Sequence, residues 1–101
     1  MLNVKGGFVY IITNVHHTVL YVGVTNDLKR RISEHKNKRN PQSFSARYNC
    51  NKLVYYNAFP YIGAAIAEEK RIKGGSRKKK IEMIQKMNPE LRDLWEDVKD
   101  W

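Results

Sequence analysis

Two short segments near the N-terminus alternate between apolar and polar positions. They cover residues 7–14 and 18–24, and the polar tetrad Asn14-Val15-His16-His17 joins them. Alternation with a period of two is typical of β-strands with one face packed on a core. A short polar connection between two such strands predicts a β-hairpin.

The register of this hairpin decides which side chains are neighbours. If Thr13 lies opposite Thr18, then Tyr10 lies opposite Tyr21. Opposite side chains in an antiparallel pair share a face of the sheet, so two phenols are expected side by side. Gly23 has no side chain, and another group can therefore approach the backbone beside Tyr21.

The hydrophobic period changes from 2 to 3.6 directly after the second strand. A helix is expected over residues 27–38, with Leu28, Ile32 and His35 on one stripe. Arg31 lies one turn before His35, so both side chains are expected near the start of the hairpin. On spacing alone, His35 is better explained as a core histidine with a satisfied ring than as a functional residue. Arg31 is either the partner of a nearby carboxylate, Asp27, or a ligand for phosphate, which suits a planar guanidinium.

The remaining pattern completes an α+β domain. It predicts a third strand over residues 52–59, a helix over 61–73, a helix that Ser76 caps, and a final helix that Asn88-Pro89 caps. We expect a small, three-stranded, mainly antiparallel sheet with helices packed against it. With 101 residues, the chain has room for one modest core, so residues 1–101 are expected to form one domain.

One carboxylate stands out in the helix over residues 61–73. The apolar stripe of this helix consists of Ile62, Ala65, Ile66 and Ile72. Glu69 falls within that stripe, and a buried carboxylate is costly unless it is paired or binds a cation. Glu69 is therefore either the partner of Arg31 or a lysine, or a ligand for a hard divalent ion such as Mg²⁺.

Charge narrows the range of partners. Lysine and arginine number 19 against 10 acidic residues, which gives a formal charge of +9 and favours a polyanionic partner such as nucleic acid. The alternative is a solvated basic surface. The main cluster is expected to contact phosphates and consists of Lys70, Arg71, Lys73, Arg77, Lys78, Lys79 and Lys80.

Other features exclude several classes of protein. A single cysteine, Cys50, rules out an internal disulfide and a cysteine-rich zinc site. His16 and His17 are adjacent in a loop, whereas metal ligands usually come from spaced positions, so they are interpreted as turn residues. The N-terminal residues have no charged segment followed by an apolar run, which predicts a cytoplasmic protein without membrane contact.

The spacing of these motifs resembles that of the GIY-YIG nuclease superfamily. The first half-motif is Phe8-Val9-Tyr10 and the second is Tyr21-Val22-Gly23. The resemblance continues through Leu28, Arg31, His35, Glu69, Ser76-Arg77 and Asn88-Pro89-Glu90-Leu91. It is strongest to the stand-alone, single-domain bacterial branch, which is related to the N-terminal nuclease domain of the excision-repair endonuclease.

This resemblance implies a metal-dependent endonuclease that hydrolyses phosphodiester bonds in DNA, in repair or in the processing of structured DNA. It implies one divalent ion, Mg²⁺ or Mn²⁺, held by Glu69. Tyr10 and Tyr21 would orient or deprotonate the attacking water, and Arg31 would stabilise the charge that develops on phosphorus. His35 would support the tyrosines or the proton transfer.

The sequence also departs from the family pattern and leaves alternatives open. Phe8 replaces the glycine of the first half-motif, and Asn88 lies far past Glu69 for the late asparagine that many relatives carry. RNA is an alternative substrate, and sequence preference would have to come from DNA shape or a partner protein. The competing classes are a non-catalytic nucleic-acid-binding module and an adaptor that uses Trp95 and Trp101. Nothing in the sequence indicates an oligomeric state.

Overall fold

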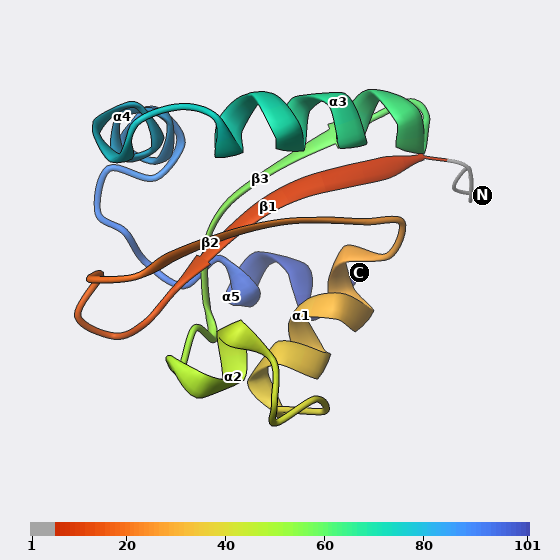
Figure 1. Cartoon of the computed structure of the whole chain (residues 1–101). Helices are drawn as coiled ribbons and strands as arrows, with labels where there is room; N and C mark the ends of the chain where they lie inside the picture. The colour runs from red at the N-terminus through yellow and green to blue at the C-terminus, as the bar shows by residue number, and fades with distance from the viewer. Residues whose placement is uncertain (1–5) are drawn as a thin grey trace.

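The computed structural model describes residues 6–101 as three strands and five helices (Figure 1). In chain order these are β1 (Gly7–Thr13), β2 (Leu20–Thr25), α1 (Leu28–Lys36), α2 (Phe44–Arg47), β3 (Lys52–Phe59), α3 (Ile62–Lys73), α4 (Arg77–Met87) and α5 (Trp95–Val98). Three helices have a side-chain cap at the N-terminus: Asp27 caps α1, Ser43 caps α2 and Ser76 caps α4. Each side chain accepts a hydrogen bond from a free backbone N–H in the first turn.

The strands form one antiparallel sheet in the order β2-β1-β3. Helices α3 and α4 lie on one face of this sheet, and α1, α2 and α5 lie on the other (Figure 1). The predicted α+β class, with a small three-stranded antiparallel sheet and flanking helices, is confirmed. Within residues 6–101, no helix is long and apolar enough to cross a membrane.

Each face of the sheet carries its own hydrophobic core, because side chains along a strand alternate between the faces. Val9 and Ile11 of β1 pack under α3 and α4, whereas Tyr10 and Ile12 pack against α1 and α5. These four side chains are completely buried. The division of the hairpin between two apolar faces is therefore as the alternation predicts.

The hairpin register differs from the predicted one by two residues. Tyr10 lies opposite Gly23 rather than Tyr21, and Thr13 lies opposite Leu20 rather than Thr18. The physical cause is the loop, where the Asn14 side chain accepts hydrogen bonds from the backbone of Thr18 and Val19 and so holds both outside the ladder. A shift of two residues preserves the faces, so Tyr10 and Tyr21 still point to the same side.

Strand β3 contains a bulge that sequence alternation does not reveal. Ile11 pairs with Tyr55 and Ile12 pairs with Leu53, which leaves Val54 as the extra residue. As a result, Val54 and Tyr55 both face the core under α3 and α4. The strand over residues 52–59 is as predicted, but Val54 and Tyr55, which would point to opposite faces in a regular strand, share one face.

Helix α3 packs on the sheet through a narrower stripe than predicted. Ala65 and Ile72 are buried, but Ile62 and Ile66 are each 38% exposed. With about 100° between successive residues, Ala65 and Ile72 lie on one line, and Ile62, Ile66 and Glu69 all lie to one side of it. Glu69 thus lies at the margin of the buried stripe, between its centre and the more exposed Ile62 and Ile66.

The predicted final helix is mostly not a helix. Leu91 has a left-handed φ of 53°, which breaks any helix at that residue. The Leu94 N–H donates to the Leu53 carbonyl over 2.7 Å, and the Asp93 carboxylate accepts from the Leu53 N–H over 3.1 Å. The segment before α5 therefore covers the free edge of β3, which satisfies backbone groups that a continuous helix would leave exposed.

Gly23 is predicted to be essential for the hairpin, because the Tyr10 ring occupies the space of its missing side chain. A Cβ at Gly23 would overlap the end of the buried Tyr10 phenol. We expect Gly23→Ala to lower the free energy of unfolding by about 1–3 kcal/mol, the usual cost of overpacking. Urea denaturation measures this change.

Gly63→Ala is the matched control. A Cβ at Gly63, in the first turn of α3, meets nothing closer than 3.7 Å. This change should be neutral or should stabilise the protein by up to about 1 kcal/mol, since alanine favours helix. Equal stability of the two variants would contradict the importance of the Tyr10 contact.

Candidate active site

The site is organised around the hydroxyl of Tyr10. This residue is completely buried, and its Oη lies 2.9 Å from His35 Nε2 and 3.3 Å from Arg31 Nε, which donates to it. Strand β1 supplies the tyrosine, and α1 supplies the other two residues one turn apart. The structure therefore brings together three of the four predicted catalytic side chains through direct contacts.

His35 is held from both of its ring nitrogens. Nδ1 lies 2.8 Å from the Ser45 hydroxyl, and Nε2 contacts Tyr10. Burial, together with the positive charge of Arg31, lowers the pKa of His35 to about 4. All contacts are satisfied when Arg31 donates to Tyr10, Tyr10 donates to His35, and the ring donates from Nδ1 to Ser45. A neutral imidazole fits this chain.

Burial raises the pKa of Tyr10 to about 12, although the Arg31 hydrogen bond and charge lower it in part. Tyr10 is thus a neutral phenol at ordinary pH, and its hydroxyl accepts a hydrogen bond from Arg31 and donates one to His35. Arg31 also pairs with Glu34 over 3.3 Å. The expected alternative partner, Asp27, instead caps α1 and pairs with Arg30. Arg31 therefore has a nearby carboxylate as its partner, but that carboxylate is Glu34, and the choice of Asp27 is wrong.

Tyr21 occupies a different position from Tyr10. It lines an open pocket of about 300 Å³ beside α1 and α2, together with Arg31 and His35. Its ring meets the edge of His35 at a centroid distance of 5.7 Å. Of the two tyrosines, Tyr21 therefore lines the pocket, whereas Tyr10 is completely buried.

Glu69 approaches this site from the opposite side of the sheet edge. Its carboxylate is 15% exposed and pairs with Lys73, one turn later, over 3.2 Å. Its negative charge is the smallest of the factors that raise the pKa of Tyr10, of which burial is the largest. Among residues 6–101, no three histidine, cysteine or acidic side chains are grouped so that they could hold a metal ion.

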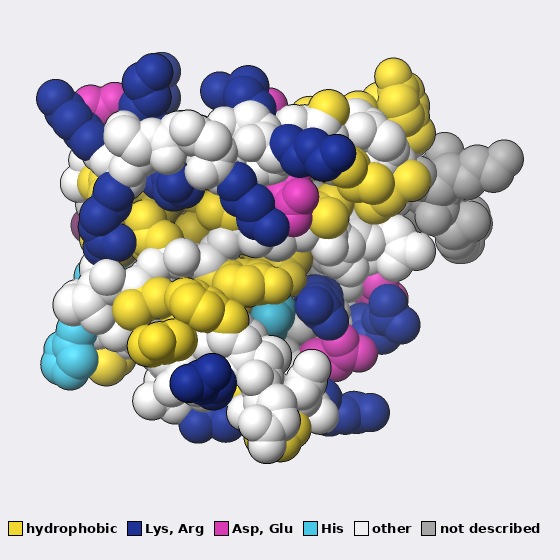
Figure 2. All heavy atoms as spheres, viewed as in Figure 1, with side chains coloured by type: hydrophobic (Ala, Val, Ile, Leu, Met, Phe, Trp, Pro, Cys, Tyr) yellow, Lys and Arg dark blue, Asp and Glu magenta, His cyan; other side chains and the backbone are white. Residues whose placement is uncertain are grey.

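The predicted basic cluster lies on α3 and α4, where lysine and arginine side chains project from the upper part of the molecule (Figure 2). Several of its members have partners. Arg71 pairs with Glu68, Arg77 donates to the His17 carbonyl over 2.8 Å, and Lys80 donates to the Gly75 carbonyl over 2.9 Å. Lys70, Lys78 and Lys79 are exposed.

Asn88 is a structural residue in this fold. It is buried, and its side chain donates to the carbonyls of Val54 and Arg92 and accepts from the Arg92 N–H. All of its hydrogen-bonding groups are therefore used to fasten the end of α4 to β3. Asn88 is thus not the late asparagine of the family pattern.

Ser45 is the site residue that the sequence analysis missed. It is buried in α2, and its hydroxyl also lies 3.3 Å from that of Ser43, the cap of the same helix. The serine pair at i and i+2 around Phe44 was visible in the sequence, but only the packing of α2 against α1 brings it to His35. No spacing rule predicts this contact.

The fold and site together define a small α+β catalytic domain of the GIY-YIG type. Residues 6–82 match the sequence model of the GIY-YIG catalytic domain. A UPF0213 protein from Bacillus pumilus (strain SAFR-032) is 34% identical over 80 residues, which cover 79% of this chain and 81% of that protein. The chain therefore belongs to the GIY-YIG family, as the half-motifs predicted.

A solved structure supports the same assignment. The solution NMR structure of a UPF0213 protein from Bacillus halodurans aligns with a TM-score of 0.55 and 26% identity, over 87% of this chain and 92% of that one. Both relatives are bacterial proteins that this chain covers over most of their length. This agrees with the predicted stand-alone bacterial branch, and the family membership supports nuclease activity in general.

The pKa of His35 predicts an acid-dependent loss of stability. Above pH 6.5 the ring is neutral in both the folded and the unfolded chain. Between pH 6.5 and about 4 the unfolded chain binds a proton that the folded protein does not, so the free energy of unfolding falls as the pH falls. Arg31, Glu34 and Tyr10 are the titratable groups that face the ring.

His35→Gln should make this decline shallower, because glutamine does not titrate. Urea denaturation of both proteins at pH 7 and pH 5 measures the difference. An NMR titration of the His35 ring gives its pKa directly. A ring that titrates near 6.5 would contradict the buried, neutral state.

Proposed function

We propose that this protein is an endonuclease that hydrolyses phosphodiester bonds in DNA with the help of one divalent ion. The observation that carries the proposal is the contact chain from Arg31 through Tyr10 to a neutral His35, beside a pocket that Tyr21 lines. A purely structural cluster does not require an arginine at the mouth of an open pocket. Family membership in a nuclease superfamily supports the same reaction.

Each side chain then has a separate task. Arg31 lines the pocket, and its guanidinium would stabilise the charge that builds up on the phosphate oxygens. Tyr21, which lines the pocket, would orient the attacking water. Both ring nitrogens of His35 are engaged by Tyr10 and Ser45. The low pKa of His35 keeps its ring neutral at pH 7, so that it accepts from Tyr10 and would hold the neighbouring Tyr21 ring in place. Tyr10 is too deeply buried to touch water and would position Arg31 and His35.

Glu69 fits the metal site that the family implies. It offers a hard oxygen ligand on the flank of α3, and Mg²⁺ or Mn²⁺ commonly takes only one or two protein carboxylates alongside phosphate oxygens and water. The bound ion would neutralise charge on the phosphate and supply Lewis acidity. Lys73, which now pairs with Glu69, would be free to turn toward a phosphate.

The test is cleavage of labelled linear, nicked, flapped and four-way DNA with Mg²⁺ or Mn²⁺. We expect the wild type to cut at least one of these substrates and Glu69→Gln to cut none. The pair with Lys73 is solvent-exposed on the lysine side, so its loss should change the free energy of unfolding by less than about 1 kcal/mol.

Glu68→Gln is the matched control, since Glu68 is the adjacent carboxylate on α3 and pairs with Arg71. It should retain cleavage. The alternative function is a binding module without catalysis. A folded wild type that binds DNA but cuts no substrate with either metal would establish that alternative.

Arg31→Lys should lower the single-turnover cleavage rate by about 10²-fold or more while the charge is kept. A lysine can neither donate to Tyr10 from the Nε position nor present two parallel donors to phosphate. Arg30→Lys is the control on the same helix, because Arg30 is exposed and pairs only with Asp27. A normal rate for Arg31→Lys would make Arg31 a structural cation.

A further inference from the structure

Three aromatic rings form a row beside the pocket, and the proposed chemistry uses only the first. Tyr21 stacks on Phe44 with ring centroids 6.0 Å apart, and Phe44 lies 4.7 Å from Tyr48. Phe44 is 48% exposed and Tyr48 is 47% exposed. We call these three residues the aromatic row.

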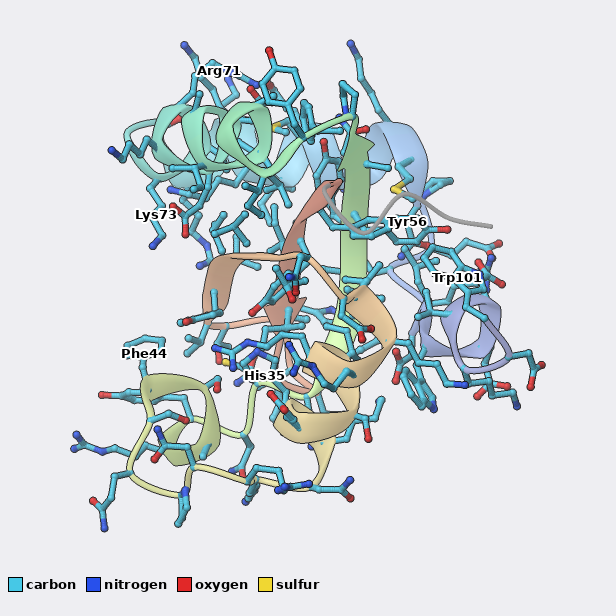
Figure 3. All side chains as sticks on the ribbon, turned by 90° about the vertical axis from the view of Figure 1, so that its right-hand side faces the viewer. His35, Phe44, Tyr56, Arg71, Lys73 and Trp101 are labelled. Atoms are coloured by element: carbon cyan, nitrogen blue, oxygen red, sulfur yellow. The ribbon has the colours of Figure 1, made fainter. Side chains whose placement is uncertain are left out.

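Two members of the aromatic row, Tyr21 and Phe44, line an open groove of about 310 Å³, and Tyr48 continues the row beyond it through its contact with Phe44. The other residues that line the groove are Leu20 and Val22 of β2 and two lysines, Lys73 and Lys80. Phe44 and Lys73 project on the same side of the molecule, with the hairpin between them (Figure 3). Figure 2 shows this arrangement as an apolar band with cationic side chains above it. Tyr21 lines both the groove and the catalytic pocket.

Packing alone does not account for these rings. Four-residue helix α2 is already held by its Ser43 cap and by the buried Ser45 and Ala46. Phe44 and Tyr48 lie on the outside of this helix and leave about half of their surface in water. Large apolar rings next to one another on a surface are typical of a binding site.

The charges around the groove identify the ligand. Lys73 pairs with Glu69 and Lys80 donates to the Gly75 carbonyl, but both side chains line the groove, and a half-exposed pair such as that of Lys73 exchanges readily for a contact with phosphate. A nucleotide presents a flat π-face to the rings and a phosphate to the lysines, whereas an apolar protein segment offers nothing to the lysines. Base stacking on aromatic side chains combined with a cationic track is the usual way to bind single strands. Bases in an intact duplex are stacked on each other and cannot offer their faces.

We propose that the aromatic row and the two lysines bind an unpaired segment of DNA next to the phosphodiester that is cut. The position of the cut rests on the proposed function, but the binding does not. Bases stack on Phe44 and Tyr48, and phosphates contact Lys73 and Lys80. The substrate class is therefore DNA with a single-stranded portion, such as a flap or a frayed end.

The test compares two fluorescent oligonucleotides of equal length in EDTA, so that no cleavage occurs. One is oligothymidylate and the other is its abasic analogue, which has the same phosphates but no bases. The wild type should bind oligothymidylate about tenfold or more tightly than the abasic chain, the effect expected from a stacked base. Fluorescence anisotropy measures both affinities.

Phe44 variants show whether the ring face is recognised. Phe44→Ala and Phe44→Leu should lose most of the preference for bases, and Phe44→Trp should keep it. Leucine preserves apolar packing on Tyr21 and Tyr48, so a folding defect in the alanine variant leaves the leucine variant as the test. Tyr61→Ala is the control, since Tyr61 is 61% exposed but lies outside the groove.

A lysine variant separates charge from stacking. Lys80→Ala should weaken binding of both oligonucleotides by the same factor and should reduce the salt dependence. A wild type that binds both chains equally, or a Phe44→Leu variant with full base preference, would overturn the proposal. Tighter binding of the matching RNA than of the DNA would overturn the assignment to DNA.

The outcome is independent of catalysis. A protein that cleaves DNA but shows no base preference retains the proposed function and loses this inference. A protein that shows base preference but never cleaves loses the proposed function and keeps the single-strand site.

Discussion

The close approach of the Tyr10 ring to the backbone of Gly23 is the constraint on which the rest of the site depends. Opposite residues in an antiparallel pair normally both carry side chains, but here one is absent and the phenol fills the space. The ring can then lie flat along the sheet with its hydroxyl directed at α1. Arg31 and His35 meet that hydroxyl from one helix, and α2 closes the arrangement through Ser45. Each half-motif thus supplies one partner of a single packing contact.

The sequence was sufficient to predict most helices and strands and the buried face of each, because hydrophobic periodicity follows directly from burial. Residues 52–59 form a strand with the predicted bounds, and the helices after Tyr61 and Ser76 begin as expected. The register of the hairpin could not be predicted from the sequence, because it depends on the hydrogen bonds that the Asn14 side chain accepts across the loop. Likewise, the bulge at Val54 adds a residue without a sequence signal.

The candidate site was predictable only as a set of residues. Family spacing selected Tyr10, Tyr21, Arg31, His35 and Glu69. In the structure Tyr21, Arg31 and His35 line one pocket, and Tyr10 is buried in contact with Arg31 and His35. The spacing could not show that Tyr10 is buried while Tyr21 is partly exposed, because strand alternation places both side chains on the same face. The position of Glu69 on a flank of α3 also needed the packing of that helix, because Ile62 and Ile66 look as buried as Ala65 in the sequence.

Residues 6–82 match the family, but residues beyond 82 complete both hydrophobic cores. Ile84 belongs to the core under α3 and α4, and Leu94 and Val98 belong to the core under α1. Asn88 fastens this tail to β3 from the inside. A chain cut at the homology boundary would thus keep every catalytic candidate yet open both cores at once. In this protein the inherited catalytic motif and the cooperative folding unit end at different residues.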